Sequence, residues 1–523
     1  MAVDASSSAS PAATAGWPSL PLLPPIVKTS RVIGPLMART CAPRPCLSTM
    51  GLATSKVAQV WHLLGHTPLA TASAPALNGL RLGLIWLHRA LVLAAMVAAP
   101  FMGTGVIGGL VWAGFAVLVA RWLTGRASFR FCLIDNWVLL FFATAAVSAM
   151  FSSYMATSMV GLVKLLTFLA AYLNARVLVA DEAEAPRWPF KWLWLLSLLI
   201  IALGTFEAVV GLWQYQHRVQ PLATWQDPEL NPELQLIRVF GTLKPANPNL
   251  LAGYMIHCLG LGVGVSLMAW LTRQWGWAVL GTGACGLMAE ALVLTGSRGA
   301  YLALAAMGGL TFLWVGHLLW HQADLKPLVR LKVAWLLAAL AVVGVVLTAV
   351  LVMPALQNRL LSIVAFREDS SNSFRMNVWS STWAMIKDNW LVGIGPGNNT
   401  FKLVYGLYMV PGYTALSAYS IFLEIWAEQG LFGLLAFLLL WLVMALRAVG
   451  VLFTRATLTT QLWAGTLIVG LASSTVYGLF DTIWYRPSVN TLFWFLVAGL
   501  AQVTTDVFAQ TAADVADKTE AAP

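Results

Sequence analysis

A short segment before one apolar run carries residues that could bind an anion. Arg238 and Lys244 precede the sequence Asn247-Pro-Asn249, and an apolar run begins at about Asn249. Two prolines, at positions 245 and 248, prevent a regular helix before that point. Asn249 could cap the helix that follows, and the positive end of the helix dipole would then face an anion held by the two cations. The alternative is an ordinary junction between a loop and a helix.

Another arginine lies where two apolar runs meet. Only the sequence Thr-Gly-Ser297-Arg298-Gly separates these runs, and a charged residue at membrane depth normally has a partner or a functional role. Glu290 precedes Arg298 by eight residues. The two would therefore share a similar helix face but lie about 12 Å apart along its axis. The alternative is that Arg298 only extends its side chain to the membrane surface.

A third polar cluster lies in the segment 354–426. Arg375 follows an acidic, serine-rich stretch, an amphipathic helical pattern covers 376–388, and Gly393-Ile-Gly-Pro-Gly-Asn398 comes next. No Lys-Ser/Thr pair follows these glycines, which excludes a P-loop, and no βαβ pattern surrounds them to support a dinucleotide site. We expect a tight turn whose exposed amides could hold an anion.

These clusters predict one anion or substrate site, formed by Arg238, Lys244, Asn247, Asn249, Arg298, Arg375 and Asn398. Other charged residues could pair inside the protein or belong to a substrate or proton pathway. They are Lys164, Glu207, Glu290, Asp481 and Arg486. The five cysteines have neither the spacing of a zinc site nor that of a disulfide framework, so we predict no metal and no cofactor.

The composition indicates that transmembrane helices position these residues. Of 523 residues, 59% are hydrophobic and only 10% are charged. Several uncharged runs approach the about 20 residues that cross a bilayer, where each backbone amide must be satisfied within a helix. The sequence predicts an all-α, polytopic transmembrane helical bundle of 11–12 spans, near 83–102, 104–123, 134–152, 156–176, 192–215, 247–270, 276–294, 299–320, 331–353, 427–447, 461–482 and 488–507. In the smaller count, the pair at 83–123 is one span and a re-entrant piece.

Basic residues recur in alternate loops, which is the positive-inside pattern for a cytoplasmic N-terminus. The loops on that side contain Arg126, Arg130, Arg187, Lys191, Arg273, Lys326, Arg330, Lys332 and Arg455. Both termini are then cytoplasmic, and 354–426 is a long extracytoplasmic loop between the ninth and tenth spans. The same bias explains the net charge of +10, so we expect no nucleic-acid partner.

The predicted transmembrane domain covers 83–507, with a segment of different composition on each side. Residues 1–80 are rich in Ala, Ser and Pro, and Asp4 is their only acid. We expect a disordered extension there, either a transit segment or the product of a misassigned start, for which Met50 is the alternative. Residues 508–523 are expected to be a disordered tail.

The order of the motifs resembles the O-antigen ligase and polymerase superfamily over about 83–505. The matching stretches are Asn247-Pro-Asn249-Leu-Leu-Ala, Gly296-Ser-Arg298-Gly, Arg375 to Trp379, Gly393-Ile-Gly-Pro-Gly-Asn and Ala427-Glu428-Gln-Gly430-Leu-Phe-Gly433. Other stretches are similar to the cyanobacterial IctB family, whose members are described as bicarbonate transporters. These are Arg367 to Arg375, Thr414 to Ser420 and Gly478 to Pro487.

The resemblance to the ligases and polymerases implies transfer of a glycan from a polyprenyl-diphosphate carrier. In that family arginines bind the diphosphate and a loop histidine assists catalysis, and Arg238, Arg298 and Arg375 occupy the matching motifs. At the histidine position this chain has Tyr419, and all seven histidines lie at or before His321. A tyrosine with its usual pKa of about 10 is a poor general base near neutrality. The catalytic residue is therefore unknown, and whether the chain is an enzyme stays open.

The resemblance leaves three functions open. Similarity to IctB implies transport or accumulation of bicarbonate through an arginine-lined, outward-facing anion site. The alternative is an O-antigen ligase- or polymerase-like glycosyltransferase that uses a lipid-linked diphosphate glycan. A second alternative is a noncatalytic membrane partner of another transporter. In each case we expect a multi-pass protein in a lipid bilayer. The expected membrane is the inner membrane of a bacterium, specifically a cyanobacterium.

Overall fold

The computed structural model of the protein describes residues 75–124, 129–181, 191–219, 237–322, 327–352, 370–454, 456–481 and 485–520, together with Leu325 and Gln357. Within these ranges all regular structure is helical, with fourteen helices and no strand. Eleven of the helices are long and apolar enough to cross a membrane. These observations confirm the predicted polytopic helical bundle.

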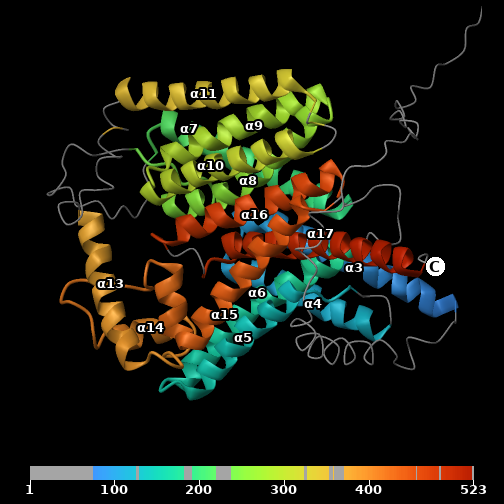
Figure 1. Ribbon diagram of the computed structural model, residues 1–523. Coiled ribbons are helices and arrows are strands. Elements are labelled where there is room, and N and C mark those ends of the chain that lie inside the picture. Colours follow the sequence, from blue (N-terminus) through green and yellow to red (C-terminus); the bar gives the residue numbers. More distant parts are fainter. Residues whose placement is uncertain are drawn as a thin grey trace, which may run out of the picture. The chain divides into compact units, whose positions relative to one another are not determined.

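The helices follow one another along the chain with short connections at most positions (Figure 1). Their bounds are α3 (Pro75–Phe101), α4 (Thr104–Leu123), α5 (Leu133–Phe151), α6 (Met155–Ala180), α7 (Lys191–Gln216), α8 (Pro248–Leu271), α9 (Trp275–Leu294), α10 (Arg298–His321), α11 (Val329–Val352), α13 (Ser370–Asp388), α14 (Asn398–Tyr405), α15 (Ile421–Leu452), α16 (Leu458–Gly478) and α17 (Pro487–Glu520). α3 and α4 are each long and apolar enough to cross a membrane, which favours two spans over one span and a re-entrant piece.

The ends of the chain differ in part from the prediction. α17 continues to Glu520, whereas the sequence analysis expected a disordered tail from residue 508. α3 begins at Pro75, inside the predicted extension 1–80, and residues 1–74 of that extension lie outside the described residues.

α16 corresponds to the predicted span 461–482, although it is not among the eleven apolar helices. It packs against α8, α10, α15 and α17, and most of its side chains are buried. A helix that is surrounded by protein does not have to present an apolar surface to lipid, so it can contain Thr, Ser, Gly and Gln. The predicted span 461–482 is therefore an interior helix of the bundle.

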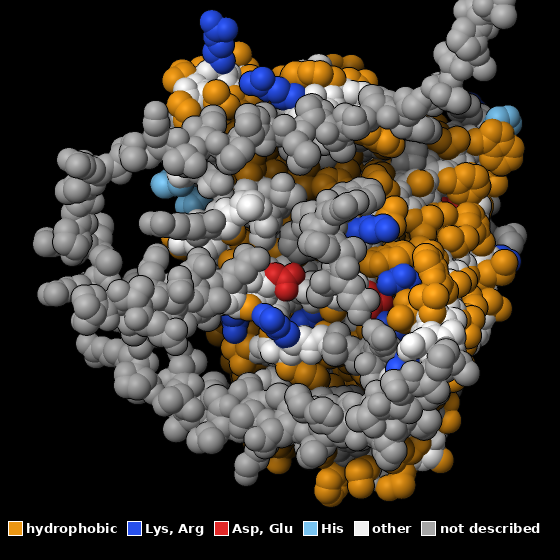
Figure 2. Space-filling model, turned by 90° about the vertical axis from the view of Figure 1, so that its right-hand side faces the viewer, with side chains coloured by type: hydrophobic (Ala, Val, Ile, Leu, Met, Phe, Trp, Pro, Cys, Tyr) orange, Lys and Arg blue, Asp and Glu red, His pale blue; other side chains and the backbone are white. Residues whose placement is uncertain are grey.

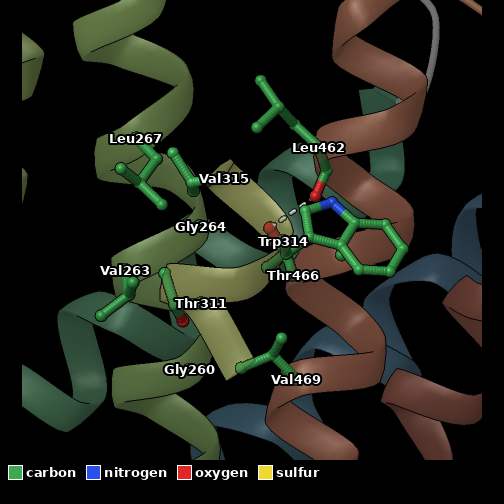
Figure 3. Close-up of a pocket in the computed structure, with 11 residues that line it drawn as sticks. Gly260, Val263, Gly264, Leu267, Thr311, Trp314, Val315, Leu462, Thr466 and Val469 are labelled. Carbon is green, nitrogen blue, oxygen red and sulfur yellow. Dashed lines mark hydrogen bonds between the residues drawn. The ribbon is translucent and has the colours of Figure 1, made fainter. Parts of the chain in front are cut away.

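A small apolar groove lies where α8, α10 and α16 meet. Figure 3 shows Val263 and Leu267 of α8 facing Thr311 and Trp314 of α10, with Thr466 on the α16 side. The indole Nε1 of Trp314 donates a hydrogen bond to the carbonyl of Gln461, at 3.2 Å. Glycines on α8 and α16 allow this close packing, which is typical of contacts between membrane helices.

Much of the described surface is apolar. Figure 2 shows hydrophobic side chains over much of the described part of one face, with few charged side chains among them. Large side chains such as Leu280, Leu313 and Leu340 are each 66% exposed. A soluble monomer rarely exposes so much contiguous apolar surface, so these faces are expected to contact lipid.

Two buried ionic networks link helices of the bundle. One network joins α5, α6 and α17, and the other joins α3, α4 and the end of α6. The Arg176 Nε lies 3.1 Å from Asp135 Oδ1, and the same guanidinium donates to Gln502. Arg121 donates to Asp181 at 2.7 Å and to His88 Nδ1 at 2.8 Å. The Asp135 carboxylate compensates the buried charge of Arg176, and Asp181 that of Arg121, so these residues stabilise the bundle as pairs.

Candidate functional site

The segment before α8 is held by two polar side chains of α7. The Gln214 amide oxygen accepts hydrogen bonds from the Phe240 and Gly241 amides, at 3.0 and 2.9 Å, and its nitrogen donates to the Gly241 carbonyl. The Glu207 carboxylate accepts from the Thr242 amide at 2.7 Å and from the Thr242 hydroxyl. Glu207 lies nine residues before the end of α7, or about 13 Å along the helix. The segment therefore enters the helix layer, and Glu207 holds its backbone in place.

Arg238 bridges this segment to the start of α8 and to the turn before α10. Its Nε donates to the Thr295 carbonyl at 2.7 Å, and another guanidinium nitrogen donates to the Asn249 side chain at 2.8 Å. Asn247 is the residue that caps α8, because its side-chain oxygen accepts from the Asn249 amide at 2.8 Å. The expectation that Asn249 is the cap was therefore wrong. Asn249 instead positions the guanidinium of Arg238.

The turn between α9 and α10 lies directly against Arg238. Gly296 has φ 63, a conformation that glycine adopts without strain, and a Cβ there would lie 3.3 Å from the Arg238 Nε. Arg298 is the first residue of α10, immediately after Ser297. The guanidinium of Arg238 therefore lies beside the positive ends of α8 and α10.

Residues 477–481, at the end of α16, connect this region to the third arginine. The Tyr477 hydroxyl donates to the Asn249 carbonyl at 2.7 Å, and a Cβ on Gly299 would lie 3.3 Å from the Tyr477 ring. The carbonyl of Phe480 accepts from Arg375 Nε at 2.9 Å, and Asp481 lies 3.7 Å from the same guanidinium. The structure thus brings Arg238 and Arg375 to one shared set of neighbours, beside the start of α10, where Arg298 is the first residue.

The other predicted site residues have different positions. Lys244 and Lys164 are exposed, and Glu290 is exposed on α9. Asn398 donates to the Leu416 carbonyl at 3.0 Å, so its described contact is within the loop. Asp481 contacts Arg375, and Arg486 lies near the Tyr419 hydroxyl. Burial lowers the pKa of Arg486, and the nearby Tyr419 opposes that shift.

Tyr419 lies near Arg375, at the edge of the group formed with Arg238 (the arginine cluster). Its backbone conformation is strained. Its φ is 50, and its ring contacts Phe374 edge to face at 5.5 Å between ring centroids. Burial and then the charge of Asp481 raise the pKa of Tyr419 to about 12, while Arg375 opposes the shift. The hydroxyl is therefore protonated near neutral pH, and it cannot serve as a base in this arrangement.

The glycine-rich turn binds the protein's own backbone. The amides of Gly393, Ile394 and Gly395 donate to the carbonyls of Asn389, Ala427 and Glu428, at 3.0, 2.9 and 3.0 Å. The expectation that these amides are exposed to an anion was therefore wrong. The turn passes so close to α6 that a Cβ on Gly161 would overlap the Pro396 carbonyl.

This turn completes a break in α15. Gly430 has φ 67 and ψ −167, so the regular helix is interrupted there. The Ala427 carbonyl accepts from Ile394, the Glu428 carbonyl accepts from Gly395 and from the Ser148 hydroxyl, and the Leu431 amide donates to the Trp390 carbonyl. These backbone groups at the break therefore find partners outside the helix, as membrane burial requires.

Sequence reasoning missed two residues that organise the site. Gln214 lies near the end of an apolar span, and Tyr477 lies inside another. Neither carries a charge, so neither interrupts its apolar run. A weak signal for Tyr477 was its position four residues before Asp481, which places both side chains near one end of the same span.

The fold and the site together define an integral membrane protein with a polar cluster at one end of its helical bundle. Residues 283–438 match the family model described as O-antigen ligase. This match includes Arg298, Arg375 and Tyr419, and it supports the superfamily that the motifs suggested. No curated protein matches the chain. The finer resemblance to IctB stays a prediction.

Proposed function

We propose that this protein transfers a glycan from a lipid-linked diphosphate to an acceptor at the end of the bundle where α8 and α10 begin. The observation that carries the proposal is that Arg238 and Arg375 meet around Asn249 and residues 477–481, beside the start of α10, where Arg298 is the first residue. The O-antigen ligase match covers two of these arginines, which supports the same class of reaction.

The chemical role of the arginines follows from the charge of the leaving group. When the bond between the sugar and the diphosphate breaks, negative charge increases on the diphosphate oxygens, and fixed guanidinium groups stabilise that charge. Arg238 is held by the neutral oxygens of Thr295 and Asn249. These bonds orient its guanidinium without cancelling its charge, which is what a diphosphate site requires.

Replacement of Arg298 by alanine tests this proposal. We expect Arg298→Ala to lower transfer by about 100-fold or more, because other cations cannot reproduce the bidentate contact of a guanidinium with phosphate oxygens. The measurement is transfer of a labelled glycan from a polyprenyl-diphosphate donor by the purified protein in proteoliposomes. Arg330→Ala, an exposed arginine at the start of α11, is the matched control. Equal transfer by wild type and Arg298→Ala would contradict the proposal.

Inorganic-carbon transport is a second candidate, and the observation that favours it is Tyr419. The family histidine is replaced there by a residue that stays protonated at neutral pH. An arginine-lined site without that base could bind a smaller anion such as bicarbonate. Uptake of labelled bicarbonate by the same proteoliposomes, under sodium, proton and voltage gradients, separates the two candidates. Saturable uptake lost in Arg298→Ala, without glycan transfer, would favour transport.

A further inference from the structure

Glu428 lies at the break in α15, where its main chain and its side chain have separate roles. Its carbonyl accepts from Gly395 and from Ser148, and these bonds help to complete the interrupted helix. The side chain lies beside the backbone of Gly397 in the adjoining turn. It is only 3% exposed, and its Oε1 has no hydrogen-bond partner among the described residues. A buried carboxyl oxygen without a partner is unfavourable for stability, so a functional reason is expected.

A second buried polar group lies beside this carboxyl. The Tyr485 hydroxyl lies beside the Glu428 carboxyl, and the backbone of Gly397 lies next to both groups. Burial and then the charge of Glu428 raise the pKa of Tyr485 well above its usual value. Tyr485 is therefore a hydrogen-bond donor at neutral pH. A hydroxyl group placed between the two side chains would accept from Tyr485 and donate to Glu428.

Glu428 and Tyr485 border the arginine cluster. Tyr485 directly precedes Arg486, which lies near the Tyr419 hydroxyl. Glu424, one turn before Glu428 on α15, lies within electrostatic range of both tyrosines. Because Tyr419 also lies near Arg375 and Asp481, the carboxyl and the arginines belong to one polar region.

We propose that Glu428 is the general base that accepts the proton of the acceptor hydroxyl, an inference that rests on the proposed glycan transfer. The acceptor O–H bond breaks, and its proton goes to Glu428 Oε1. The acceptor oxygen forms a bond to the anomeric carbon of the donor sugar. The bond from that carbon to the diphosphate breaks, and its electron pair leaves on the diphosphate. The acceptor is therefore a compound with a sugar or alcohol hydroxyl, which Tyr485 orients by a hydrogen bond.

Several charged and titratable groups lie in the same region as Glu428. Glu424 on the same helix, Tyr485 and Arg486 before α17, and Asp481 with Tyr419 beyond them are the groups of this region. α13 contributes Arg375, and α16 contributes Tyr477. α5 presents the uncharged Ser148 and Thr144 to this part of α15.

Replacement of Glu428 by glutamine tests the inference. Glu428→Gln keeps the size of the side chain and every main-chain bond of the break, but it cannot accept a proton. We expect its maximal transfer rate to fall about 100-fold or more. We expect its affinity for the polyprenyl-diphosphate donor to stay within about three-fold, because the arginines are unchanged. Asp388→Asn, which makes the same chemical change at an exposed position on α13, should transfer like the wild type.

The pH dependence separates a base from a structural residue. The wild-type rate should fall as the pH is lowered, because a protonated carboxyl cannot accept the acceptor's proton. Glu428→Asp keeps a carboxyl and should retain this dependence at a lower rate, whereas the small remaining rate of Glu428→Gln should lose it. Wild-type-like transfer by Glu428→Gln would overturn the inference but leave the proposed function intact. Absence of transfer by the wild type would instead overturn the proposed function.

Discussion

Tyr419 has a backbone conformation that tyrosine rarely adopts. The backbone of a residue with a Cβ is strained at φ 50. Such a conformation persists only where contacts with the surrounding structure hold it in place. Here the ring packs against Phe374, and the hydroxyl lies near Asp481 and Arg375. The position of Tyr419 is thus set by the same residues that form the arginine cluster. The contacts of Tyr419 therefore connect the segment before α15 to the arginine cluster.

The raised pKa of Tyr419 predicts a loss of stability at high pH. Its pKa is 10.0 when unperturbed and about 12 in the fold, so the unfolded chain releases this proton first. The contribution is complete below pH 10 and is lost as the pH rises towards 12. As the pH rises from 10 to 12, the free energy of unfolding should fall by about 1–2 kcal/mol more for the wild type than for Tyr419→Phe, which cannot release a proton. Thermal unfolding in detergent at several pH values measures the difference, and parallel curves would contradict it.

The arginines of the site were predictable because charges are rare in an apolar sequence. The sequence also contained a signal for the residue that caps α8. Proline is favoured at the first helical position, so Pro248 indicates Asn247, and not Asn249, as the cap. The neighbours that join the arginines were not predictable. They include backbone carbonyls and the uncharged Tyr477 of α16, and only the packing of the helices brings them to the site.

The break in α15 has a specific requirement for glycine. At φ 67 and ψ −167 the backbone of Gly430 is in a region that is essentially restricted to glycine, and an added Cβ would overlap the Leu391 carbonyl. Gly430→Ala should therefore lower the free energy of unfolding by about 2 kcal/mol or more. Unfolding in mixed micelles by a denaturing detergent measures the loss.

A matched glycine gives the control for this prediction. Gly308 lies in the regular helix α10, and a Cβ there would meet nothing within 4 Å. Gly308→Ala should be neutral or should stabilise the protein by up to about 1 kcal/mol, because alanine restricts the unfolded chain. Equal stability of the two variants would show that the break does not require glycine.

At the scale of the whole molecule, hydropathy was sufficient for the helices but not for their packing. Long uncharged runs fixed eleven spans because lipid allows few alternatives to a helix. The hydropathy of the sequence also located α16, although that helix is less apolar than the others. Hydropathy could not show that α16 is interior, or that Asp135 and Arg176, from distant parts of the sequence, form one buried pair.

Removal of one member of that pair should destabilise the bundle. Asp135→Ala leaves the Arg176 guanidinium buried without its carboxylate, which should lower stability by about 3–5 kcal/mol. The double replacement Asp135→Leu with Arg176→Met removes both charges and should be less harmful than the single change. Detergent-induced unfolding of the three proteins provides the comparison. A single variant as stable as the wild type would contradict a stabilising role of the pair.

The completion of α15 by residues 390–395 also determines how this part of the protein can open. The loop cannot separate from the helix without leaving the carbonyls of Ala427 and Glu428 unpaired at a buried position. The amide hydrogens of Ile394, Gly395 and Leu431, although far apart in sequence, are therefore protected from solvent exchange by one common opening event. The loop and the broken helix thus behave as a single unit in local unfolding.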